Sequence, residues 1–82
     1  MTKKEKRLEK ARRNPKNVSF EDLRCILFDH GFVEISSRGS HHTFRYGKWR
    51  LTVARRKPHV LATYVKQAIR IIDKSNEEDS NG

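Results

Sequence analysis

Two segments of the chain carry apolar residues at the spacing of an amphipathic helix. In the first, the apolar residues recur every three or four positions and share one face: Phe20, Leu23, Ile26 and Leu27. Ser19 is a typical N-cap residue and Gly31 a typical C-terminal stop, which together predict a helix over residues 19–30. A similar stripe predicts a second helix from about residue 60 to residue 73. Its members are Leu61, Tyr64, Val65, Ala68, Ile69 and Ile72.

The region between these helices alternates apolar and polar residues, which is typical of strands that bury one face. It predicts strands over residues 32–36, 41–46 and 49–54, with a tight hairpin turn at Gly47-Lys48. The apolar face of this hairpin would hold the pairs Tyr46–Trp49, Phe44–Leu51 and His42–Val53. The basic face would hold the pairs Arg45–Arg50, Thr43–Thr52 and His41–Ala54. A β-bulge between residues 41 and 44 would exchange the faces of the two histidines.

The order of these elements favours a small α+β domain. Helix, three strands and helix are most simply arranged as a three-stranded antiparallel sheet whose apolar face is covered by both helices. The chain has 82 residues, of which 34% are hydrophobic, so it has room for one modest core and no second lobe. We therefore expect an α-β-β-β-α domain over residues 18–73.

The two ends of the chain differ in composition from this domain. Residues 2–13 favour a helix but contain only Leu8 and Ala11 as apolar members, so little can anchor that helix to a core. We predict a basic, mobile or loosely docked extension over residues 1–17, which either serves as an interaction arm or is simply solvated. Residues 74–82 are polar and acidic, and we predict a disordered tail there.

The charge of the chain points to a polyanionic partner. The formal net charge is +9, and nucleic acid is the commonest partner of a basic domain that has no membrane segment. Residues 18–72 contain ten Lys and Arg against four acidic residues, so the predicted domain is basic without the N-terminal extension. The alternative is a charged surface that serves only solubility.

The sequence lacks the signals that are typical of disulfide-rich, secreted and membrane proteins. The single cysteine, Cys25, excludes an internal disulfide framework. It lies among apolar residues, where a buried thiol is ordinary and a catalytic Cys–His pair is the alternative. No apolar run approaches the roughly 20 residues that span a bilayer, and the charged N-terminus lacks the apolar stretch of a signal peptide. We therefore expect a cytoplasmic protein with no membrane partner.

Metal-dependent nuclease chemistry lacks its usual ligands in this sequence. Two-metal sites need clustered carboxylates, whereas the acidic residues of the predicted domain are scattered: Glu21, Asp22, Asp29 and Glu34. A zinc site would have to draw on Cys25 and the histidines, but His41 and His42 would point to opposite faces of a strand. We expect no metal and no cofactor.

His41 is the candidate residue for acid–base chemistry, and the alternative is an exposed histidine with no chemical role. A histidine with the reference pKa of about 6.5 can accept a proton from a ribose 2′-hydroxyl, and the activated oxygen can then attack the adjacent phosphorus. This reaction needs RNA and no metal. Neighbouring groups would bind the RNA and offset charge on its phosphoryl oxygens. The candidates are Arg38, Gly39, Ser40, Arg45, Arg50, Arg55, Arg56 and Lys57.

The segment from Val18 to Asp73 resembles the HicA toxins of bacterial type II toxin–antitoxin systems. The matching pieces are the start of the first helix, its end, the turn before the second strand, the hairpin and the last helix. They read Ser19-Phe20-Glu21-Asp22-Leu23, Gly31-Phe32, Arg38-Gly39-Ser40-His41-His42-x-Phe44, Leu51-Thr52-Val53 and Tyr64-Val65-Lys66-Gln67-Ala68.

The resemblance implies a fold similar to the double-stranded RNA-binding domain and metal-independent cleavage of messenger RNA. It implies that His41 is catalytic, that Gly39 and Ser40 form the turn that presents it, and that a HicB-like antitoxin covers the active face. The chain departs from the family after the third strand. The family pattern there is Val-Pro-x-His, whereas this chain has a longer basic loop before His59, so the resemblance assigns His59 no role.

Two other functions use the same residues. One is a catalytically silent RNA-binding module on the same basic face, and the other is a protein-interaction module that acts with an antitoxin. Three other residues also have two possible roles. Alternation predicts that His42 faces the apolar side, and the alternative is a direct catalytic role. Tyr46 and Trp49 either close the edge of the core or stack on bases.

Overall fold

The computed structural model describes residues 2–81 of the chain. The helices are α1 (Lys3–Arg13), α2 (Phe20–Asp29) and α3 (Ala62–Asn81). The strands are β1 (Val33–Arg38), β2 (His41–Tyr46) and β3 (Trp49–Ala54), which form one antiparallel sheet in the order β1-β2-β3. The predicted α+β class and the three-stranded sheet are confirmed.

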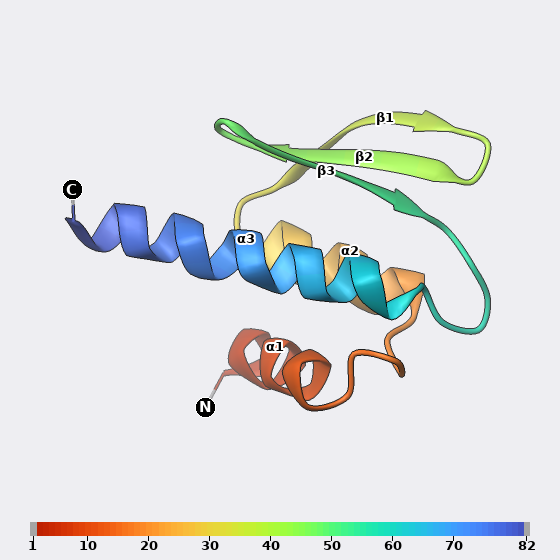
Figure 1. Ribbon diagram of the computed structural model, residues 1–82, viewed down its shortest axis with the longest axis horizontal. Helices are drawn as coiled ribbons and strands as arrows, with labels where there is room; N and C mark the ends of the chain where they lie inside the picture. Colours follow the sequence, from red (N-terminus) through yellow and green to blue (C-terminus); the bar gives the residue numbers. More distant parts are fainter. Residues whose placement is uncertain (1, 82) are drawn as a thin grey trace.

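The helices all lie on the same side of the sheet (Figure 1). α2 and α3 lie between the sheet and α1, so the molecule has a sheet layer, a layer of two helices and a third helix beneath them. None of the described helices lies on the opposite face of the sheet. This arrangement agrees with the expected packing of two helices on one face of the sheet and adds α1 as a further layer.

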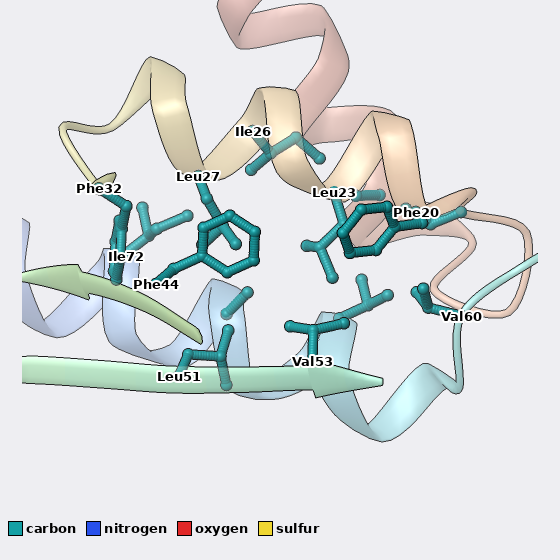
Figure 2. Close-up of a cluster of buried hydrophobic side chains, with 14 residues drawn as sticks. Phe20, Leu23, Ile26, Leu27, Phe32, Phe44, Leu51, Val53, Val60 and Ile72 are labelled. Carbon is teal, nitrogen blue, oxygen red and sulfur yellow. The ribbon is translucent and has the colours of Figure 1, made fainter. Parts of the chain in front are cut away.

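The core fills the space between the sheet and the helices α2 and α3 (Figure 2). Phe44 and Val53 are fully buried and meet side chains from both helices, among them Leu27 of α2 and Ile72 of α3. Burying a large apolar side chain contributes about 1.5–3 kcal/mol, so these contacts provide the main driving force for the fold. β2 and β3 supply the buried residues of the sheet, whereas no residue of β1 is buried.

The register of the β2–β3 hairpin is the one predicted from alternation. Tyr46 pairs with Trp49 at the turn, and His41 pairs with Ala54 at the other end, with no irregularity between them. A bulge does occur in the sheet, but it lies in β1. Glu34 pairs with Phe44 and Ser36 with Thr43, so residue 35 is the extra residue. The faces of His41 and His42 are therefore not exchanged.

The N-terminal segment corrects the expectation of an extension with little to anchor it. α1 packs against α2 and α3, and Ala11 is buried with only 2% of its surface exposed. Two ion pairs flank this contact: Arg7 with Asp29 at the end of α2, and Arg12 with Asp73 of α3. Ala11 and the two arginines therefore hold α1 against α2 and α3, although the composition of this helix alone favours exposure to solvent.

The C-terminal segment also differs from the prediction. Residues 74–81 continue α3 instead of forming a disordered tail. Ser75 is buried, and its hydroxyl donates a hydrogen bond to the carbonyl oxygen of Ile72. Further along, Glu78 accepts a hydrogen bond of 2.8 Å from the Nζ of Lys48 in the hairpin turn. One acidic residue of this segment therefore pairs with the basic hairpin turn.

Candidate nucleic-acid interface

The open face of the sheet gathers the polar and basic residues that alternation assigned to it. The register places nine residues there: Val33, Ser36, Arg38, His41, Thr43, Arg45, Arg50, Thr52 and Ala54. The hydroxyls of Thr43 and Thr52 lie 2.9 Å apart and form a hydrogen bond across the middle of this face. Arg45 and Arg50 are paired near the hairpin turn, and Arg38 is paired with His41 at the far end. The face is thus polar in the middle and cationic at both ends.

His41 stands at the start of β2 on this open face. Its side chain is exposed, Arg38 is its partner on β1, and Ala54 is its partner on β3. Because alanine has only a methyl group, one flank of the imidazole is free of a bulky neighbour. The histidine therefore has an arginine on one side and a small residue on the other.

A two-residue turn presents this histidine. Gly39 and Ser40 join the paired residues Arg38 and His41, and Gly39 has a φ of +56°. A turn with positive φ favours glycine, because a side chain there crowds the backbone. Apart from the glycine and its two chain neighbours, no described atom lies within 4 Å of the position that a Cβ would take at Gly39, so the glycine is needed for its backbone angle rather than for space.

The basic loop after β3 is attached to the same turn. The N–H of Arg55 donates a hydrogen bond of 2.6 Å to the carbonyl oxygen of Ser40, which brings the loop beside His41. The Arg55 guanidinium, however, contacts the start of α2. It lies 3.7 Å from Glu21 Oε1 and 5.7 Å from the centre of the Phe20 ring.

The remaining cations near this end of the sheet are Arg56 and Lys57, which are exposed. The predicted site residues therefore fall into two groups. Arg38, His41, Arg45 and Arg50 share the open face, with Gly39 and Ser40 as its turn. The loop residues flank that face, and among them the Arg55 side chain is engaged elsewhere. Sequence alternation gives no information on the side chains of a loop, so it could not separate Arg55 from its neighbours.

The opposite side of β2 holds a contact that sequence reasoning missed. His42 is 13% exposed in its side chain, and its ring lies 4.6 Å from the centre of Phe20, as expected for a residue facing the core. Its Nδ1 lies 3.5 Å from Oε2 of Glu34, and Oε1 of Glu34 lies 3.4 Å from Nε of Arg24. His42 thus lies beside the ion pair of Glu34 and Arg24 beneath β1. The pairing of β1 with β2 brings Glu34 near His42, and the packing of α2 under the sheet adds Arg24.

The other histidines lie away from His41. His59 is half-buried in the loop before α3, next to a hollow lined by Lys16 and Arg56. His30 caps the end of α2, where burial lowers its pKa and the charge of Lys4 lowers it further, against the opposing charge of Asp29. In the described part of the chain no three His, Cys, Asp or Glu side chains lie close enough to hold a metal ion together.

Comparison of the chain with protein-family models, curated proteins and solved structures found no match. None of the described helices has the length and apolar character needed to cross a membrane.

Proposed function

We propose that this protein is a cytoplasmic, HicA-like toxin that cleaves messenger RNA, with His41 as its catalytic residue. The observation that carries the proposal is an exposed histidine beside an arginine, on a polar sheet face that no helix covers. The resemblance of the motif from Arg38 to Phe44 to the HicA toxins supports the same assignment.

The chemistry follows from the groups at this end of the sheet. The neutral imidazole of His41 accepts the proton of a ribose 2′-hydroxyl, and the 2′-oxygen forms a bond to the adjacent phosphorus. The bond from phosphorus to the 5′-oxygen breaks, and a 2′,3′-cyclic phosphate remains. The leaving oxygen takes up a proton from water, and the protonated imidazole later releases its proton to the solvent. Arg38 offsets the charge that develops on the phosphoryl oxygens. No step in this scheme requires a metal.

Binding of the RNA strand rests on the other cations. Arg45 and Arg50 lie along the open face from His41 toward the hairpin turn, and Arg56 and Lys57 lie beyond β3. A strand that crosses the face can place its phosphates against both ends while one ribose reaches His41. We further propose that a HicB-like antitoxin covers this face, since covering it would block access to the histidine.

The test is cleavage of a single-stranded RNA by purified wild-type protein and by His41→Ala. We expect the substitution to reduce the cleavage rate by about 10²- to 10⁴-fold, the usual contribution of a general acid–base group, with RNA affinity largely retained. His59→Ala is the matched control and should cleave like the wild type. An RNA with 2′-O-methyl groups should bind and stay intact, and a chelator should leave cleavage unchanged.

The outcomes separate the candidate functions. Cleavage by His41→Ala at the wild-type rate would contradict the assignment of the catalytic residue. Binding of RNA by the wild type without any cleavage would instead identify a catalytically silent RNA-binding module. The arginines of the open face would be sufficient for that binding. In cells, induced expression should arrest growth and degrade RNA with the wild type only.

A further inference from the structure

β1 is an edge strand that supplies no side chain to the core. Its residues are exposed apart from the half-buried Glu34, and within the described part of the chain it pairs with β2 alone. The outer edge of such a strand presents a row of N–H and C=O groups that a further strand can pair with. A strand that gives little to the core while exposing its edge is a candidate interaction surface.

Apolar side chains lie exposed along this strand. Val33 is 58% exposed and Ile35, the extra residue of the bulge, is 42% exposed. Phe28 of α2 is 43% exposed and lies on the helix side of the sheet near Glu34, because Arg24 contacts both its ring, at 5.1 Å, and the carboxylate of Glu34, at 3.4 Å. We call Phe28 and residues 33–38 the β1 edge.

The charges around the β1 edge are mostly positive. Arg24 lies beneath the strand, Arg38 ends it, and Arg45 is paired with Val33. Glu34 is the one acidic residue of β1, and it faces Arg24 and His42. A second copy of this chain, with a net charge of +9, would bring like charges to this surface. An acidic segment would bring complementary charges.

We propose that the β1 edge binds an extended, acidic segment of a partner protein, which adds to the sheet as a fourth strand. Main-chain hydrogen bonds to β1 would provide the part of the affinity that does not depend on the partner's sequence, and alternate side chains would provide the specificity. Apolar side chains of the added strand contact Ile35 and Phe28, and its carboxylates contact Arg38 and Arg45. The inference does not depend on ribonuclease activity.

The probe is a short synthetic peptide in which Val and Glu alternate, with both ends blocked. The matched control peptide alternates Ser and Glu, and so carries the same charge without apolar side chains. With ¹⁵N-labelled full-length protein, the Val–Glu peptide should shift the amide signals of residues 33–38 and slow the hydrogen exchange of their outward amides. The control peptide should bind about tenfold or more weakly, because charge alone does not form the strand contacts.

Two variants with equal changes in charge test the location. Ile35→Lys should weaken binding of the Val–Glu peptide by about tenfold, because a lysine opposes an added strand at an edge. Leu61→Lys replaces an apolar residue of nearly equal exposure, 43%, before α3 and should bind like the wild type. Circular dichroism should show both variants folded, as expected for substitutions at exposed positions. If Ile35→Lys does not fold, Val33→Lys replaces it as the test variant. A change in the hydrogen exchange of wild-type β1 that salt alone produces does not support the proposal.

Other results would overturn the proposal. Shifts confined to the arginines of the open face, equal for both peptides and unchanged in Ile35→Lys, would show simple charge attraction. Absence of binding at low salt, or a concentration-dependent dimer of the protein that Ile35→Lys abolishes, would also reject an acidic partner strand. All three results can occur with a fully active nuclease, so they leave the proposed function untouched.

Discussion

At the scale of single residues, His30 shows how packing between helices sets a protonation equilibrium. Its pKa is lowered mainly because burial disfavours the charged ring, with a further contribution from Lys4. Nε2 of the ring is buried without a hydrogen-bond partner among the described residues, which agrees with a neutral side chain in the folded protein. His30 lies where α2 ends, close to charges of α1 and α3.

The lowered pKa of His30 predicts a loss of stability in mild acid. The unfolded chain binds the proton near the ordinary pKa of 6.5, whereas the folded protein binds it only at lower pH. The contribution of His30 is therefore fully present above the ordinary pKa and is lost as the pH falls below it. His30→Gln should flatten the dependence of the free energy of unfolding on pH between about pH 7 and pH 5. Urea unfolding at several pH values measures this slope, with His59→Gln as the control; equal slopes for His30→Gln and wild type would contradict the prediction.

At the scale of elements, α1 is the clearest case of a helix that packs against expectation. Its composition is strongly polar, yet it has a regular N-cap, in which the Thr2 hydroxyl accepts a hydrogen bond from the N–H of Glu5. It meets α2 and α3 through Ala11, a residue small enough to let the helices approach. Arg12 adds a hydrogen bond of 2.9 Å to Asp73, which lowers the pKa of that carboxyl chiefly through the same bond.

A buried Ala11 predicts that α1 stabilises the whole domain. Ala11→Glu would place an unpaired charge in the contact between helices and should lower the free energy of unfolding by more than about 2 kcal/mol. Lys10→Glu alters the charge of the adjacent exposed residue and should change it by about 0.5 kcal/mol or less. Chemical denaturation followed by circular dichroism measures both. Equal stabilities for Ala11→Glu and Lys10→Glu would show that α1 contributes nothing to the core.

At the scale of the whole molecule, the charges are divided between an open face and ion pairs among the elements. Arg50 and Arg55 are both exposed, but the Arg55 guanidinium also contacts Glu21 and Phe20 at the start of α2. Arg7 and Arg12 pair with acidic residues of α2 and α3. The net charge of +9 therefore does not act as a uniform field, and only part of it is available to a nucleic acid.

This division predicts a difference between two arginines in RNA binding. Each phosphate contact contributes about 0.7 to the slope of log affinity against log salt for a single strand. Arg50→Ala should reduce the magnitude of that slope by about this amount, and Arg55→Ala should reduce it less, although both remove one charge. Fluorescence anisotropy with a labelled single-stranded RNA over a series of salt concentrations measures the slopes. A larger effect of Arg55→Ala would assign the main contact to the loop.

Local signals predicted a large part of the fold because they act over a few residues. Ser19 does cap α2, where its hydroxyl accepts a hydrogen bond from the N–H of Asp22. The hairpin register followed from Gly47-Lys48 and from alternation, and it placed His41 on the open face and His42 toward the core. Two-residue periodicity and a short turn are enough for this, because both are properties of adjacent positions.

The sequence by itself determined the helix α2, the hairpin and the face on which His41 lies. The tertiary structure alone decided the docking of α1, the extension of α3 to Asn81, the bulge at residue 35 and the direction of the Arg55 side chain. Each of these depends on partners far along the chain, such as Asp73 for Arg12 and Glu21 for Arg55. Periodicity records which face of an element is apolar, but it does not record which distant charge or side chain that element will meet.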